Sequence, residues 1–144
     1  MKITERLTTE QIIEQLKQDY ARFPKDQTYG LYAEDVKFKD PLNKFKGVKR
    51  FRQMIGFIDW FFGDVQMDLH SIEESAPSLI ELRWTLNMNP PVPWSARLHI
   101  PGRTELWLSE QGVIASHVDY WSCSRLDVLK QVFRTSQSVD NSVE

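Results

Sequence analysis

The period of the hydrophobic pattern changes near Gly63, and this change constrains the fold more than any other feature. Before Gly63, apolar residues recur mainly at spacings of three and four, which is typical of helices with one buried side. After it, apolar and polar residues tend to alternate, which is typical of strands with one buried face. Helices followed by a run of antiparallel strands indicate an α+β fold.

We expect three helices in the first half of the chain. A capping box that starts at Thr8 opens the first, and Pro24 ends it because the residue before a proline avoids the helical region. Residues 26–32 are expected to form a shorter second helix. Residues 47–62 are expected to form the third, whose apolar positions are Val48, Phe51, Ile55, Ile58 and Phe62.

A short strand, residues 36–40, is expected between the second and third helices. Its alternation puts Val36, Phe38 and Asp40 on one face and two lysines on the other. A carboxylate would then share a face with two core residues, beside a proline that ends the strand. The segment is therefore the first candidate for a functional site.

The second half is expected to supply the rest of a strongly curved antiparallel sheet, with strands near 65–73, 80–88, 94–108 and 113–123. Which face of this sheet carries Trp84 and which carries Arg83 stays open, because a slip of one residue reverses every side chain. Three N-terminal helices on the concave face would enclose a cone-shaped cavity. Residues 127–133 favour a closing helical turn. Residues 1–134 are expected to form one domain, with a polar, disordered tail at 135–144.

The composition excludes several classes of protein. A net charge of −2, with both signs mixed along the chain, gives no indication of a nucleic-acid or membrane partner. The single cysteine, Cys123, excludes an intrachain disulfide and indicates a reducing, cytoplasmic setting. The three histidines lack the spacing of metal ligands, so we expect neither metal nor cofactor. No apolar run approaches the ~20 residues of a membrane span, and the N-terminus lacks the apolar core of a secretory signal.

Two segments carry a resemblance to a known superfamily. The first reads L-Y-A-E-D-V-K-F-K-D-P, followed by G-V-K-R-F, and the second reads E-Q-G-V-I-A-S-H-V-D-Y-W-S. On these the chain is identified as a member of the nuclear transport factor 2-like superfamily, a cystatin-like α+β barrel. Ketosteroid isomerase, the SnoaL-like polyketide cyclases, scytalone dehydratase and limonene epoxide hydrolase share this fold. Within it, the chain is most similar to the uncharacterised DUF2358 family.

The resemblance implies positions for a site. Asp40 matches the catalytic base of ketosteroid isomerase, but that enzyme's oxyanion-hole groups match Thr104 and Leu16, with Tyr20 one turn further along. This departure argues against a true ketosteroid isomerase. Asp119 matches the region in which SnoaL-like cyclases carry an acid/base aspartate.

The candidate catalytic residues are therefore Asp40, His117 and Asp119. The candidate ligand-binding residues are Tyr20, Phe38, Trp84, Thr104 and Trp121. Each has a structural alternative: Asp40 as an acceptor of hydrogen bonds at a turn, and the pair His117 and Asp119 as a buried contact or a solvated one. Arg83 would join the site only if it faced the cavity.

The expected function is binding of a small, mostly apolar ligand, with isomerase-, cyclase- or dehydratase-like acid/base chemistry as an option. The alternative is a non-catalytic module that dimerises or binds a partner through the sheet face. Whether the chain is an enzyme stays open, and a homodimer is expected in either case. The basic run at 44–52 is interpreted as a solvated face, and the aromatic cluster at 60–62 as core or dimer contact.

Overall fold

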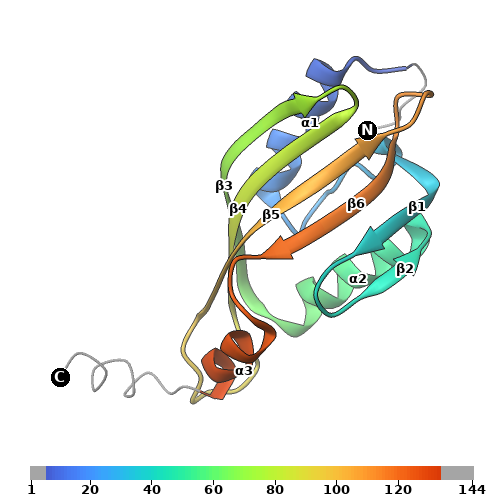
Figure 1. The fold of residues 1–144 in the computed structure, drawn as a ribbon. Coiled ribbons are helices and arrows are strands. Elements are labelled where there is room, and N and C mark those ends of the chain that lie inside the picture. Colours follow the sequence, from blue (N-terminus) through green and yellow to red (C-terminus); the bar gives the residue numbers. More distant parts are fainter. Residues whose placement is uncertain (1–5, 134–144) are drawn as a thin grey trace.

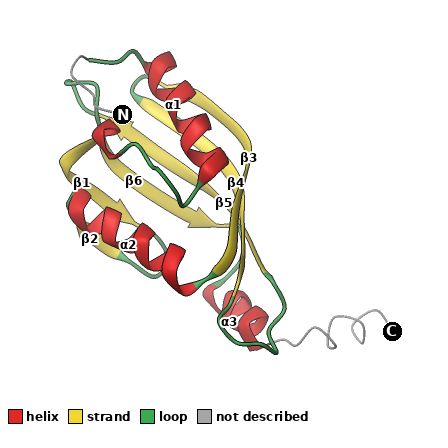
Figure 2. Cartoon of the chain, turned by 180° about the vertical axis from the view of Figure 1, so that it is seen from behind, coloured by secondary structure: helices red, strands yellow, loops and turns green. Residues whose placement is uncertain are grey.

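The computed structural model describes residues 6–133, which form a curved six-stranded sheet with helices on one face and at one end (Figures 1 and 2). The tail expected at 135–144 lies outside the described residues. In chain order the elements are α1 (Thr9–Arg22), the 3₁₀ turn η1 (Tyr29–Leu31), β1 (Tyr32–Lys39), β2 (Lys44–Lys46), α2 (Val48–Phe61), β3 (Gly63–Ala76), β4 (Leu79–Asn89), β5 (Leu98–Leu108), β6 (Ile114–Trp121) and α3 (Arg125–Phe133).

The sheet is mixed, with strand order β2-β1-β6-β5-β4-β3. Every neighbouring pair is antiparallel except β1 and β6, which run parallel. The α+β fold is confirmed, but the expectation of a wholly antiparallel sheet is corrected at this pair. A parallel pair needs a long crossover, and here the whole segment from β2 to β5 supplies it. The two outer strands do not meet, so the sheet is curved but not closed.

The helices depart from expectation in two places. The helix expected at 26–32 is absent, because residues 29–31 form the single turn η1 and Tyr32 already begins β1. Thr28 precedes this turn without a side-chain cap, and its backbone N–H and hydroxyl both donate to Asp19 at 2.9 Å. The third helix of the fold is α3, which follows the last strand at the end of the sheet and begins two residues before the closing helical turn expected at 127–133 (Figure 1). The strand β2 was not expected at all, since three residues carry too little pattern to detect.

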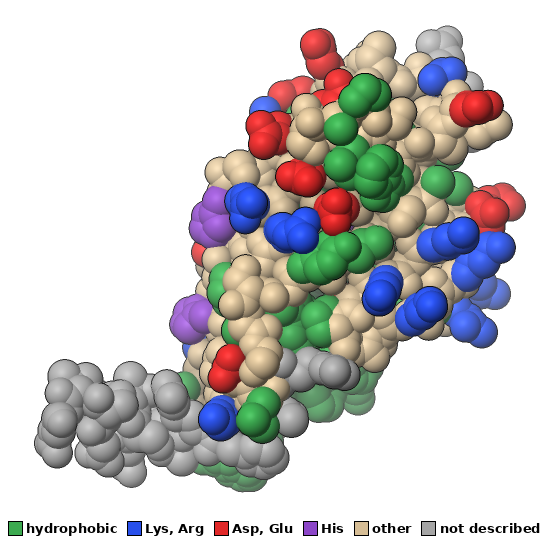
Figure 3. Space-filling view, in the orientation of Figure 1, with side chains coloured by type: hydrophobic (Ala, Val, Ile, Leu, Met, Phe, Trp, Pro, Cys, Tyr) green, Lys and Arg blue, Asp and Glu red, His purple; other side chains and the backbone are tan. Residues whose placement is uncertain are grey.

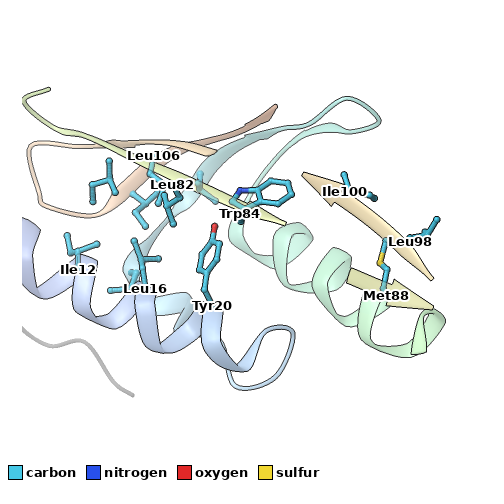
Figure 4. Close-up of a cluster of buried hydrophobic side chains, with 13 residues drawn as sticks. Ile12, Leu16, Tyr20, Leu82, Trp84, Met88, Leu98, Ile100 and Leu106 are labelled. Atoms are coloured by element: carbon cyan, nitrogen blue, oxygen red, sulfur yellow. The ribbon is translucent and has the colours of Figure 1, made fainter. Parts of the chain in front are cut away.

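The main core lies between α1 and the concave face of the sheet. Ile12, Leu16 and Tyr20 recur on one side of α1 and point at the sheet (Figure 4). They meet alternate residues of β4 and β5, among them Leu82 and Leu106, which are fully buried. A core of this kind loses roughly 2–5 kcal/mol when one leucine is cut back to alanine.

A second, smaller cluster holds α2 against β1. Phe38, Phe51 and Ile55 are buried there, and the rings of Phe38 and Phe51 lie 5.5 Å apart. The concave face is thus covered by α1 along one part and by α2 along another (Figure 2). The space between these two packing zones is the site described next.

Candidate functional site

A cavity of about 430 Å³ lies between the two helices and the concave face of the sheet. Most of its wall is apolar, contributed by α2 and by the ends of β4 and β5. The structure brings all of the sequence-predicted site residues to this wall: Tyr20, Phe38, Asp40, Trp84, Thr104, His117, Asp119 and Trp121. All eight side chains therefore converge on one space.

The strand registers explain why these side chains meet. Thr104 of β5 lies opposite Asp119 of β6, and His117 lies opposite Leu106, a fully buried core residue. Because side chains alternate along a strand, His117, Asp119 and Trp121 share the concave face with Thr104. Across the parallel pair, His117 lies beside Phe38 of β1.

A chain of hydrogen bonds runs through the polar end of the cavity. The indole Nε1–H of Trp84 donates to Thr104 Oγ1 at 2.7 Å, and Thr104 Oγ1 donates to Asp119 Oδ1 at 2.5 Å. His117 Nε2 lies 2.8 Å from the same Oδ1. Since a carboxylate only accepts, Nε2 is the nitrogen that carries the hydrogen. Thr104 and His117 therefore fix the position of the Asp119 carboxylate, and Trp84 in turn holds Thr104.

The free oxygen of Asp119 is the chemically available group. Both bonds fall on Oδ1, and no described residue donates to Oδ2. The side chain keeps 18% of its surface exposed, at the wall of the cavity. A carboxylate that is held by one oxygen and open at the other is positioned to accept a hydrogen bond or a proton from a ligand.

His117 serves the carboxylate from an aromatic setting. Its ring lies 5.0 Å from Phe38 and 5.3 Å from Phe51, centroid to centroid. Its Nδ1 atom is buried and has no hydrogen-bond partner within residues 6–133. Such an orphaned atom costs free energy, which is the kind of cost that proteins retain at functional sites.

Tyr20 adds a hydroxyl beside the same network. Figure 4 shows this hydroxyl pointing from α1 toward Trp84. Burial and the negative charge of Asp119 raise the pKa of Tyr20 well above its usual value, although a hydrogen bond with Thr104 opposes them. Burial likewise raises the pKa of Tyr32. Both phenols therefore stay protonated, and Tyr20 remains a neutral polar group at the cavity wall.

Asp40 lies at the rim of the cavity with its carboxylate engaged in a turn. Its Oδ1 accepts from the backbone N–H of Leu42 at 2.8 Å and of Asn43 at 2.5 Å. The side-chain amide of Asn43 donates to both oxygens, at 3.2 and 3.1 Å. Asp40 comes directly after β1 and starts the turn to β2. These contacts favour the structural alternative for Asp40.

The two faces of β4 are now assigned. Trp84 is 4% exposed and faces the cavity, whereas Arg83 is exposed on the convex face. Arg83 therefore does not bridge Asp40 and Asp119. Within residues 6–133 no group of histidine, cysteine, aspartate or glutamate side chains is arranged to hold a metal ion.

The part of the wall that α2 supplies was not predicted from the sequence. Met54, Phe57 and Ile58 line the cavity from this helix, and Leu42 reaches it from the turn after β1. Phe57 carried a usable signal, since it is a large apolar residue outside the buried phase of its helix.

Residues 6–133 contain no helix that is long and apolar enough to cross a membrane.

The chain matches the model of one known protein family. The model of a family described as an uncharacterized conserved protein (DUF2358) matches residues 10–117. None of the curated proteins matches the sequence. The resemblance inferred from the two sequence segments is therefore confirmed at the level of the family.

Solved structures share the fold at low sequence identity. A protein with a ketosteroid isomerase-like fold from Catenulispora acidiphila, in complex with trimethylamine, has a TM-score of 0.70 at 17% identity and covers 90% of this chain and 98% of its own. A protein from Jannaschia assigned as a SnoaL-like polyketide cyclase gives 0.68 at 10%, covering 90% and 97%. One with the same assignment from Shewanella denitrificans gives 0.63 at 16%, covering 88% and 98%.

Proposed function

We propose that this chain, which belongs to the DUF2358 family, binds a small, mostly apolar molecule in its cavity and uses Asp119 for acid/base chemistry on it. The observation that carries the proposal is the Asp119 carboxylate, held through Oδ1 by Thr104 and His117 and open at Oδ2. Proteins assigned as polyketide cyclases share the fold, which supports chemistry of this kind without fixing the substrate.

The arrangement supports a proton-transfer role in three steps. An apolar ligand packs against the wall formed by α2 and displaces water from the cavity. Its polar group meets Asp119 Oδ2, which accepts a proton from it while the bonds to Oδ1 hold the carboxyl group in place. The same group then returns the proton at another atom of the ligand, as isomerisation, cyclisation or dehydration requires.

The test combines ligand detection with two matched substitutions. Native mass spectrometry of the purified full chain is expected to reveal a retained small molecule, and Asp119→Asn is expected to lose turnover or weaken retention at least ten-fold. Asp40→Asn, which removes the same charge at the rim, is expected to leave both unchanged. The proposal is overturned if the purified chain retains no molecule and also binds an apolar dye no better than a variant whose cavity is filled, such as Leu86→Trp.

The alternative is a non-catalytic module that acts through the convex face of the sheet. Its support is the exposure of Trp107 and Tyr120 on that face, where a soluble chain gains by burying them. A homodimer formed through this face belongs to both proposals. Both proposals also include a cytoplasmic location. The free thiol of Cys123 supports it, because a protein without a disulfide does not need an oxidising compartment.

A further inference from the structure

The cavity contains carboxylates but no basic side chain beside them. Asp40 and Asp119 are its acidic residues, and no lysine or arginine is among the described residues that line it. Neither carboxylate forms an ion pair with a lysine or arginine whose side chain is described. Asp40 uses its oxygens in the turn after β1, whereas Asp119 has no described donor at Oδ2. Asp119 is therefore the carboxylate that is available to a ligand.

His117 does not supply the missing positive charge. Its Nε2–H donates to Asp119 Oδ1 at 2.8 Å, while Nδ1 is buried in the aromatic setting of Phe38 and Phe51. A protonated ring would place a second N–H at Nδ1, where no described residue offers an acceptor. Because an unpaired buried donor costs free energy, this setting favours the neutral ring. The pair of His117 and Asp119 therefore keeps the negative charge of the carboxylate.

The negative charge acts on the two tyrosines that line the cavity. Burial raises the pKa of Tyr20, and the charge of Asp119 raises it further. Burial also comes first in raising the pKa of Tyr32, and Asp119 is among the groups that add to it. A carboxylate that opposes the ionisation of two phenols also opposes the entry of an anionic ligand.

Aromatic side chains surround this carboxylate on the cavity wall. Trp121 lies two residues along β6 on the same face, and Trp84 is joined to Asp119 through Thr104. Tyr20 lines the same space from α1. Aromatic rings attract cations through the negative potential of their faces, and the attraction grows where water is excluded. Proteins use aromatic walls of this kind to bind ammonium ligands.

A ligand that fills the cavity must also satisfy Asp119 Oδ2. A wholly apolar molecule would displace water from this oxygen and leave a charged acceptor without a donor, which is costly. A neutral hydroxyl can donate to it, but a hydrogen bond between two charged groups is stronger. A metal ion fits poorly, because hard cations need several oxygen ligands and the described residues hold no group of side chains arranged to supply them. The cation that suits this cavity is therefore organic.

We propose that the ligand of this cavity is an organic amine in its cationic form, with its ammonium group at Asp119 Oδ2 and an apolar body along α2. Met54 and Ile58 of α2 and Leu86 of β4 line the part of the wall that this body contacts. The inference rests on the ligand binding proposed above, because it names the class of ligand for the same cavity. It does not rest on proton transfer, since an ion pair needs only the charge of the carboxylate.

Three small molecules of matched shape test the preference for positive charge. N,N-Dimethylbenzylamine is cationic at neutral pH, isobutylbenzene is its uncharged isostere, and phenylacetate is an anion of nearly the same shape. Titration of each with the full chain, followed by NMR of the ligand, gives the three dissociation constants. We expect the amine to bind about ten-fold more tightly than isobutylbenzene, and phenylacetate to bind more weakly than both.

Two matched substitutions assign the preference to Asp119. Asp119→Asn removes the charge and keeps the shape, so the amine should lose its advantage and bind within about two-fold of isobutylbenzene. Asp35→Asn removes the same charge from an exposed position of β1 and should preserve the ten-fold preference. The comparison of the three ligands on the unmodified chain decides the inference even if Asp119→Asn does not fold.

The outcomes separate this inference from the function proposed above. The inference is overturned if the unmodified chain binds isobutylbenzene or phenylacetate as tightly as the amine, or if Asp119→Asn keeps the preference for the amine. In each of these cases the cavity still binds a small molecule, so the proposed function survives. A chain that binds none of the three molecules overturns the inference and counts against the cavity as a binding site as well.

Discussion

The indole ring of Trp84 lies so close to Gly102, its cross-strand partner, that a Cβ atom at position 102 would approach the ring within 2.6 Å. The same atom would come within 2.7 Å of the Tyr120 carbonyl oxygen. Gly102 lies in the middle of β5, and the space it leaves is what allows the ring to occupy the concave face. In that position Nε1 reaches Thr104, which in turn holds Asp119.

Replacing Gly102 by alanine is therefore expected to disturb both stability and the site. The ring and the neighbouring strand must shift, which costs roughly 1–3 kcal/mol as overpacking in a core does. The hydrogen bond from Trp84 to Thr104 should weaken with it, and so should ligand retention. Urea denaturation and native mass spectrometry of Gly102→Ala measure the two effects.

Gly56→Ala is the control for this substitution. Gly56 lies on the exposed side of α2, and no atom lies within 4 Å of an added Cβ. Alanine there should stabilise the helix by about 0.5–1 kcal/mol, because glycine loses more backbone entropy on folding. A Gly102→Ala protein as stable as the unmodified chain would show that the ring position is not enforced by this contact.

The alternation of β4 predicted that Leu82, Trp84 and Leu86 share a face, because period two is a local property of the chain. It did not decide which face, since burial depends on where α1 packs. The positions of Thr104, His117 and Asp119 around one cavity agree with the resemblance, and their roles stay predictions. The parallel pairing of β1 with β6 joins segments far apart in sequence, so no local pattern encodes it.

Asp40 illustrates a different limit. The alternation of Val36 and Phe38 extends by one more residue to Asp40, but the strand ends at Lys39 and the backbone turns. The return strand β2, which makes this a hairpin, is only three residues long. Its lysines carry no hydrophobic signal, so the return strand was not predicted. The turn at Asp40, before Pro41, was predicted only as the alternative to a position on the core face.

Asp40→Asn is expected to lower stability by roughly 1–3 kcal/mol, because the Asp40 carboxylate accepts the backbone N–H groups of Leu42 and Asn43. The midpoint of urea unfolding measures the loss. Asp35→Asn makes the same change at an exposed position of β1 and should have an effect below about 0.5 kcal/mol. Equal stability of the two variants would mean that the turn does not depend on the charge.

Alkaline pH is expected to destabilise the fold through its buried tyrosines. The pKa of Tyr20 is raised by burial, so the folded state binds a proton that the unfolded state releases above pH ~10. The contribution is fully present below that pH and is lost as the pH rises toward the folded pKa, at up to ~1.4 kcal/mol per pH unit. Tyr20→Phe should reduce the slope of stability against pH above pH 10, measured by urea unfolding at each pH. An unchanged slope would show that Tyr20 does not contribute to it.

The convex face is expected to mediate a homodimer centred on Trp107. This side chain is 43% exposed, and Tyr120 nearby is covered on one side by Arg103, whose guanidinium carbon lies 4.1 Å from the ring centroid. Figure 3 shows hydrophobic side chains on this face set among charges of both signs, which suits a self-complementary contact. Light scattering should then report twice the 17.0 kDa of one chain.

Trp107→Glu should convert this dimer to a monomer, because the interface would have to bury an unpaired carboxylate at its centre. Trp94→Glu introduces the same charge at an exposed tryptophan outside the strands and should leave the mass unchanged. A stable interface needs about 1,000 Å² of buried surface, more than one side chain supplies, so the substitution must act on a contact that spans several strands. A chain that stays monomeric at high concentration would refute the dimer, whereas one that stays dimeric after Trp107→Glu would move the contact away from this face.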